Sequence, residues 1–243
     1  MKTSKKKLKF TDLLQESLWF VKLRPVAWFG YCLFVGAVLV LGKISLAAGI
    51  FAAVSCLFVG VGIAKYIDMK TTSEHPVGFY WAINKSLPLA VLAASGIVAC
   101  WFVFMLVASL ISGEYYKIGE FFFHWELTPH NLHRETAREV FSWVYSYANV
   151  TLIFVLLMLT TFAGWFSHPL MLFKNARWSE AKEQSDRTVA KNQSALYKML
   201  GFVFFEAVLC TTITPLLTPV LYMLVSTLMY VSYKSVFETD DPA

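Results

Sequence analysis

Glu206 is the residue whose position most suggests chemistry, because it is the one carboxylate inside a long apolar run. An ionised carboxylate at mid-bilayer costs at least about 2.5 kcal/mol, so such a group faces the protein interior, finds a partner or takes up a proton. Two interpretations stay open. Glu206 is either an intramembrane ion or proton site, or a neutral group hydrogen-bonded across a helix interface.

Three histidines between two other apolar runs form a candidate metal site. His130 and His133 follow Thr128-Pro129, a sequence that starts helices well, and their spacing of three places both imidazoles on one face. Zinc needs three or four such ligands, and His124 or Glu126 lies nearby in the sequence. The pattern lacks the HExxH spacing of a metalloprotease. An interfacial segment is the alternative, with an aromatic belt formed by Phe121, Phe122, Phe123 and Trp125.

No residue pattern points to an enzyme. The sequence has no glycine-rich phosphate loop, no Ser-His-Asp order and no paired carboxylates. His168-Pro169 and His75-Pro76 are typical of helix ends rather than of catalytic histidines. The sequence therefore predicts a non-enzymatic protein without a cofactor.

A stripe of small and mildly polar residues marks the segment that follows Ser179, a suitable N-cap. Ala181, Ser185, Thr188 and Asn192 recur at steps of four, three and four, which places them on one face of a helix. The stripe either packs against the protein's own second loop or docks a partner. Packing is the commoner use of such a face.

These residues must be positioned by long apolar helices. The 243 residues are 57% hydrophobic and 15% charged, with a mean hydropathy of +0.57. A soluble domain carries about 25% charged residues, and the apolar excess here is gathered in runs long enough to cross a bilayer. The sequence predicts an all-α polytopic membrane bundle of about six transmembrane helices. The expected spans are residues 26–41, 44–64, 87–112, 143–166, 195–213 and 216–232.

The distribution of lysine and arginine predicts the orientation of these spans. With the N-terminus inside, 17 of the 21 basic residues fall in cytoplasmic segments and 4 in outer ones. Both termini are therefore expected in the cytoplasm, within residues 1–25 and 235–243. The outer loop would be residues 113–142 and the helix-bearing cytoplasmic loop residues 167–194. Basic residues that flank apolar runs do not indicate nucleic-acid binding, and the expected partner is the lipid bilayer.

A short amphipathic helix is expected before the first span, over residues 11–23. Leu14, Leu18 and Val21 share one face, so the helix would lie in the membrane interface. No apolar core and cleavage site follow the basic opening, so the first span would act as an uncleaved anchor. The four cysteines all fall within apolar runs, where a free thiol packs as a small apolar group: Cys32, Cys56, Cys100 and Cys210.

The chain resembles poorly characterised bacterial polytopic inner-membrane proteins, similar in style to the YciC-like family and to the membrane domain of some glycerophosphodiesterases. The resemblance covers most of the chain and implies a helical inner-membrane fold without catalytic residues. It is carried by Leu23-Arg24-Pro25-Val26-Ala27-Trp28, by Gly78-Phe79-Tyr80-Trp81-Ala82 with Leu87-Pro88-Leu89, and by His168-Pro169-Leu170 with Ala181, Ser185 and Asn192.

The leading hypothesis for function is a non-enzymatic accessory or scaffolding subunit of a membrane complex, which would contact other membrane proteins or further copies of itself. The alternative is a small carrier or channel that uses Glu206. A metal-dependent enzyme at the outer face is a third class, and it would need His124, His130 and His133.

Overall fold

The fold is entirely helical in a computed structural model that describes residues 8–72, 78–128 and 136–238. His75 and Pro76 lie outside the described residues, as do His130 and His133. The described elements, in chain order, are α1 (Phe10–Leu23), α2 (Pro25–Val38), η1 (Leu39–Lys43), α3 (Leu46–Thr72), α4 (Phe79–Ser112), α5 (Tyr116–Phe122), α7 (Ala137–Met158), η2 (Leu159–Ala163), α8 (Ser167–Lys174), α9 (Trp178–Lys191), α10 (Gln193–Thr212), η3 (Pro215–Leu217) and α11 (Thr218–Phe237).

Six described helices are long and apolar enough to cross a membrane, which confirms the expected bundle of six. They are α2 with η1, α3, α4, α7 with η2, α10, and η3 with α11. Two of them begin earlier than the apolar runs indicated. The third starts at Phe79 and not near 87, because the polar turn that includes Lys85 is helical and the Lys85 ammonium lies over the Trp81 ring at 5.4 Å. The fourth starts at Ala137, where Thr136 and Glu139 form a capping box.

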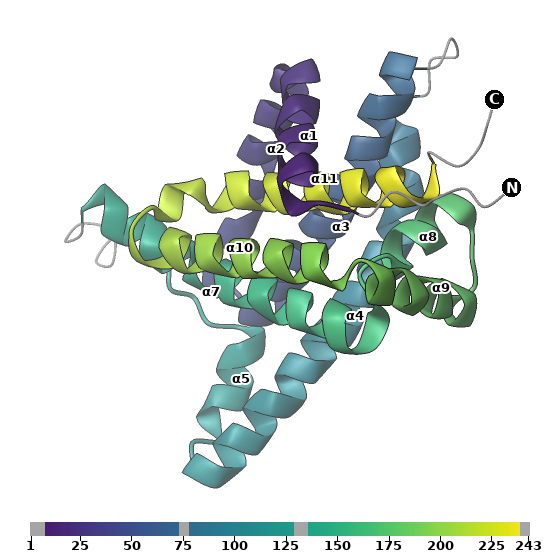
Figure 1. Cartoon of the computed structure of the whole chain (residues 1–243). Coiled ribbons are helices and arrows are strands. Elements are labelled where there is room, and N and C mark those ends of the chain that lie inside the picture. Colours follow the sequence, from purple (N-terminus) through teal and green to yellow (C-terminus); the bar gives the residue numbers. More distant parts are fainter. Residues whose placement is uncertain (1–7, 73–77, 129–135, 239–243) are drawn as a thin grey trace, which may run out of the picture.

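The spans form a layered arrangement with α11 at its centre (Figure 1). In this view α7, α10 and α11 run side by side, and the α3–α4 pair crosses them. Hydrogen bonds join α11 to both groups. The Tyr222 hydroxyl donates to the Ala148 carbonyl at 2.7 Å on α7, and the Ser226 hydroxyl donates to the Leu57 carbonyl at 3.0 Å on α3. Of the candidate spans, α11 and α3 are the most buried and α4 is the least.

The amphipathic helix expected over residues 11–23 is α1, and it packs on the bundle. Leu13, Ser17 and Phe20 are buried, whereas Leu18 is half exposed. The Phe20 ring contacts both Trp28 and Tyr230, at centroid distances of 6.3 and 5.6 Å. The apolar spacing alone did not separate the side chains of α1 that face the protein from those that face outward. The exposed side chains Leu18 and Trp19 remain on the outer side of α1, as an interfacial helix requires.

Candidate functional site

Glu206 lies about two thirds of the way along α10, on the edge of the face that packs on the bundle. Its side chain is half buried, and it makes no hydrogen bond or ion pair within the described residues. Phe202, one turn earlier, packs on Phe10 of α1 with a ring distance of 5.6 Å. Glu206 therefore sits just beyond the α1–α10 contact, and the described part of the chain groups no histidine or further carboxylates with it as metal ligands.

Replacing Glu206 with leucine should stabilise the isolated protein in lipid. A carboxyl group at this depth costs energy without a described partner to offset it, so we expect a gain of about 1–2 kcal/mol in unfolding free energy. Thermal unfolding in nanodiscs measures the gain, and Gln184→Leu, at an exposed position of α9 outside the candidate spans, serves as the comparison. A clear loss of stability in Glu206→Leu would mean that the carboxyl group is hydrogen-bonded in the native membrane.

The candidate histidine site is not assembled by the described residues. His124 Nδ1 lies 3.8 Å from Glu120 Oε1, and His124 Nε2 lies 3.9 Å from Glu126 Oε1. Glu126 is already engaged, because the buried Lys43 ammonium donates to it at 3.0 Å and also lies 4.4 Å over the Trp143 ring. The described part of the chain holds no group of three metal-ligating side chains. These contacts fasten the chain after α5 to the α2–α3 turn.

The stripe on α9 packs within the protein, but against the turn before α8 and not against the second loop that the sequence suggested. Ala181 and Ser185 are fully buried, and the Ser185 hydroxyl accepts a hydrogen bond from the Phe166 amide at 3.0 Å. A Cβ at Gly164, where φ is +83°, would lie 2.5 Å from Ser185 Oγ, so glycine is required for this close approach. The surface that receives the stripe is α8 and the turn before it. Thr188 is partly buried, and Asn192 accepts a hydrogen bond from the Leu8 amide at 3.1 Å.

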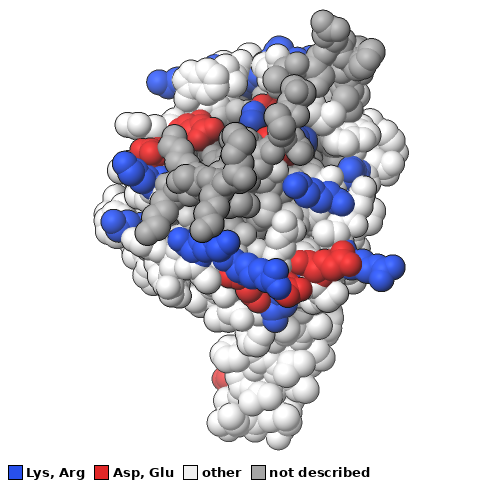
Figure 2. Space-filling view, turned by 45° about the vertical axis from the view of Figure 1, so that its right-hand side comes forward, with Lys and Arg blue, Asp and Glu red and all other residues white. Residues whose placement is uncertain are grey.

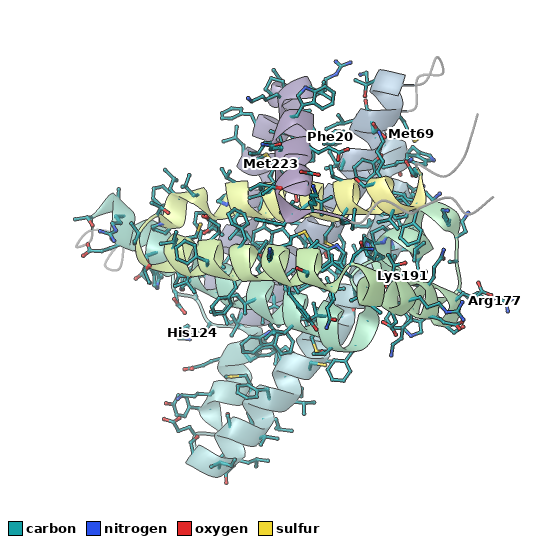
Figure 3. All side chains as sticks on the ribbon, viewed as in Figure 1. Phe20, Met69, His124, Arg177, Lys191 and Met223 are labelled. Atoms are coloured by element: carbon teal, nitrogen blue, oxygen red, sulfur yellow. The ribbon has the colours of Figure 1, made fainter. Side chains whose placement is uncertain are left out.

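Figure 3 places the two candidate regions far apart in that view. His124 lies near the α5 end of the molecule, whereas Arg177 and Lys191 mark the two ends of α9 on the opposite side. The residues singled out in the sequence therefore do not converge on one site. Glu206, His124 and the α9 stripe lie in three separate parts of the structure.

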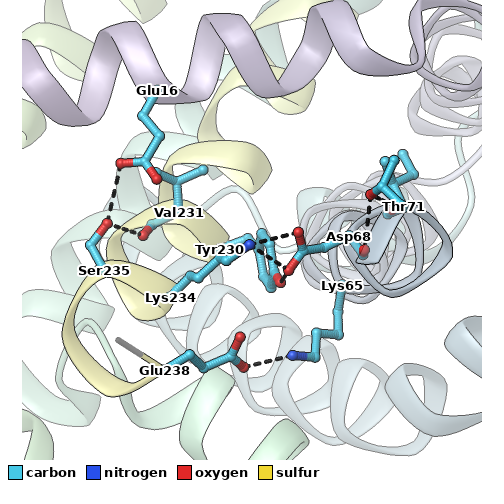
Figure 4. A network of polar contacts seen from close by, with 10 residues as sticks. Glu16, Lys65, Asp68, Thr71, Tyr230, Val231, Lys234, Ser235 and Glu238 are labelled. Atoms are coloured by element: carbon cyan, nitrogen blue, oxygen red, sulfur yellow. Dashed lines mark hydrogen bonds and ion pairs between the residues drawn. The ribbon is translucent and has the colours of Figure 1, made fainter. Parts of the chain in front are cut away.

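A charged network joins three helices at the end of the bundle where α3 and α11 finish (Figure 4). Asp68 on α3 accepts from the Lys234 ammonium at 2.7 and 2.8 Å and from the Tyr230 hydroxyl. Lys65 donates to Glu238 at 2.6 Å, and Ser235 bonds to Glu16 of α1 at 3.4 Å. Local sequence patterns do not reveal this network, because Asp68 and its partners are more than 160 residues apart.

An apolar cavity between α4, α7 and α8 was also missed. Its volume is about 370 Å³, and His168 lines it. The last turn of the fourth span, η2, is π-helical and borders the cavity through Leu159, Phe162 and Ala163. Single π turns within α-helices are frequent at functional sites. The fourth span ends before His168, at Ala163, and His168-Pro169 lies in the first turn of α8.

No protein family, characterised protein or solved structure matches this chain. The six candidate spans make it a multi-pass helical membrane protein. The described residues contain four features that bear on chemistry. Two are the ion-pair clusters around Lys43–Glu126 and Asp68–Lys234, and the others are the isolated Glu206 carboxyl group and the apolar cavity beside the buried His168.

Proposed function

We propose that the chain is a non-enzymatic accessory or scaffolding subunit of a membrane complex in the bacterial inner membrane, with both termini in the cytoplasm. The resemblance to YciC-like proteins and the basic inner segments support this location. One observation carries the proposal of a subunit role: the hairpin formed by α4 and α5 presents a large apolar surface that its own bundle leaves uncovered.

The α4–α5 hairpin projects from the body of the molecule (Figure 1). α4 has 34 residues, about 51 Å at ~1.5 Å per residue, whereas a hydrocarbon core is about 30 Å thick. α5 turns back along α4, where the rings of Phe121 and Phe122 contact Phe102 at 5.9 and 5.2 Å. Figure 2 shows the projecting lobe almost free of charged side chains, which gather on the body above it.

The tip of the hairpin carries charges that favour water. Lys117 pairs with Glu114 beside Gly113, the left-handed residue that ends α4. Ile111, on the last turn of α4, is 83% exposed, and Phe104 is 64% exposed. An apolar surface this close to a charged tip is costly at the water boundary unless another molecule covers it. The proposed cover is a membrane-embedded helical protein that packs along α4.

Photo-crosslinking tests this proposal directly. A photoreactive phenylalanine at Phe104 or Ile111, in the full chain in native membranes, should give a discrete protein adduct. The same group at Phe205, an exposed residue on α10, is the matched control and should give lipid adducts only. Adducts that are equally diffuse at all three positions, together with a lone monomer after purification in mild detergent, would refute the subunit role.

The alternative proposal is a carrier or channel that uses Glu206, supported by a half-buried carboxyl group inside a span. Proton or ion flux in reconstituted vesicles should then fall at least tenfold in Glu206→Gln. Flux that is indifferent to this change would remove the carrier from consideration.

A further inference from the structure

A long apolar groove lies between α2 and α3 and is closed at one side by the first turns of α4. Phe34 and Val38 line it from α2, and Phe79 and Ile83 line it from α4. Along α3 the lining covers residues 51–67, about 24 Å at ~1.5 Å per residue. One leaflet of a bilayer holds about 15 Å of hydrocarbon, so this groove, the α2–α3 groove, is long enough for an acyl chain.

The dimensions of the α2–α3 groove select a thin occupant. Its volume is about 650 Å³, and this volume spread over about 24 Å gives a mean cross-section of about 27 Å². A helix with its side chains is about 10 Å across and needs roughly 80 Å². The groove is therefore too narrow for a transmembrane helix of another protein or of a second copy, and it suits a single hydrocarbon chain.

One end of the groove opens into a depression that carries positive charge. This depression has a volume of about 550 Å³ and lies beside the joint between α1 and α2. Val26, Tyr66 and Phe79 line both spaces, so the two are continuous. Arg24 and Lys70 line the depression only, and both side chains are exposed. We call these two residues the basic mouth of the groove.

The charges of the basic mouth are not neutralised by the described part of the chain. Neither Arg24 nor Lys70 forms an ion pair there. The Lys70 ammonium donates to the Tyr66 hydroxyl at 3.4 Å and lies 5.7 Å over the same ring, which places its charge where the depression meets the groove. Asp68, the carboxylate nearest to Lys70 in the sequence, is paired with Lys234.

An apolar groove that ends in two cations is complementary to an anionic lipid. Basic pockets between transmembrane helices at the cytoplasmic side bind anionic head groups, and the proposed orientation places this end of the bundle in the cytoplasm. A zwitterionic lipid would fill the groove equally well, but its head group carries no net charge for Arg24 and Lys70 to attract. The basic mouth thus favours one class of lipid over the other.

We propose that the α2–α3 groove binds an anionic phospholipid, with one acyl chain between α2 and α3 and the phosphate between Arg24 and Lys70. The site is independent of the subunit role and of Glu206. It uses the first turns of α4 and not the projecting α4–α5 hairpin, and α10 does not line it.

The test uses the full chain in phosphatidylcholine nanodiscs that contain a small fraction of phosphatidylglycerol with a diazirine in one acyl chain. We expect saturable photolabelling of the α2 and α3 residues that line the groove. A phosphatidylcholine probe with the same chains, at the same mole fraction, should label these residues at least about fivefold less. Fivefold corresponds to about 1 kcal/mol, the contribution of one basic residue near an anionic membrane surface.

Charge variants test the basic mouth. Arg24→Gln and Lys70→Gln should each weaken phosphatidylglycerol binding about fivefold, for the same reason. The matched control is Lys191→Gln combined with Lys198→Gln, because both lysines are exposed, form no ion pair among the described residues and do not line the groove. This control removes the same net charge as the double variant of the mouth and should leave labelling unchanged.

Two glycines provide a matched pair for blocking the groove. A Cβ at Gly30 or at Gly201 meets nothing within 4 Å, so there is room for a larger side chain at either position. Gly30 lines the α2–α3 groove and Gly201 does not. Gly30→Leu should reduce labelling by both lipid probes at least about tenfold, and Gly201→Leu should leave it unchanged.

Four outcomes would overturn the proposal. Equal labelling by the two probes would mean that the groove belongs to the ordinary lipid shell. An equal loss in the Lys191 and Lys198 control would assign the preference to general surface charge. Glycerol phosphate that competes as well as phosphatidylglycerol would indicate a phosphate site without an acyl chain. A protein adduct from a photoreactive phenylalanine at Phe34 would place a partner in the groove.

Thermal unfolding of each variant separates loss of binding from loss of folding. Arg24 and Lys70 are exposed and form no ion pair within the described residues, so Arg24→Gln and Lys70→Gln should unfold close to wild type. Gly30→Leu reaches the same site through its apolar part, and its effect does not depend on either charge.

Discussion

Replacing Gly42 with alanine is expected to destabilise the folded protein by about 3 kcal/mol, the upper part of the range for overpacked sites. A Cβ at Gly42 would lie 2.1 Å from Tyr147 Cε1 and 2.3 Å from Tyr147 Cζ. The ring cannot easily turn away, because its hydroxyl donates to the Leu39 carbonyl at 2.5 Å. On another side, a Cβ at Gly49 would lie 2.4 Å from the Gly42 Cα. The backbone of the α2–α3 turn thus packs directly on the Tyr147 ring of α7 and on the backbone of α3 at Gly49.

The effect of Gly42→Ala is measured by thermal unfolding of the purified protein in detergent. Gly30→Ala in α2 is the control, because a Cβ there meets nothing within 4 Å. Alanine is the better helix former, so Gly30→Ala should leave stability unchanged or raise it by up to about 1 kcal/mol. Equal stability of the two variants would show that the α2–α3 turn is looser than its packing indicates.

The fold was predictable from the sequence because a bilayer constrains it so strongly. A chain that crosses hydrocarbon must satisfy its backbone internally, so long apolar runs become helices. The ends of the helices were less predictable. The polar residues around Lys85 and Glu139 break the apolar runs, yet they continue the helices, through a contact with Trp81 and a capping box. Hydropathy detects the part of a helix that contacts lipid, and these helices continue beyond their apolar runs.

The candidate sites were predictable only where a residue type is unusual for its surroundings. Glu206 stands out because a carboxyl group is rare in an apolar run. The α9 stripe also followed from local spacing, and Ala181 and Ser185 are indeed buried. Asp68 and His168 could not be singled out, because their roles depend on residues from distant parts of the chain. The Asp68–Lys234 pair is 166 residues apart, and the His168 cavity is assembled from α3, α4 and α7.

Replacing Asp68 with alanine is expected to cost about 2–3 kcal/mol, because it leaves a cation and a buried hydroxyl without their acceptor. The Asp68 side chain is 13% exposed, and Lys234 is 37% exposed, so water compensates only part of the loss. Thermal unfolding again gives the measurement. Glu183→Ala is the control, because it breaks an equally short but exposed pair with Arg187 and should change stability by less than about 1 kcal/mol.

A double replacement separates the charge of the network from its packing. Asp68→Leu combined with Lys234→Met removes both charges and keeps most of the volume, so we expect it to recover much of the stability that Asp68→Ala loses. Such recovery would mean that the single variant suffers from an unpaired lysine and not from a cavity. If Asp68→Ala is no less stable than Glu183→Ala, the α3 and α11 ends are held by the ring contacts of Tyr230, to Phe20 at 5.6 Å and Phe173 at 5.9 Å, rather than by the ion pair.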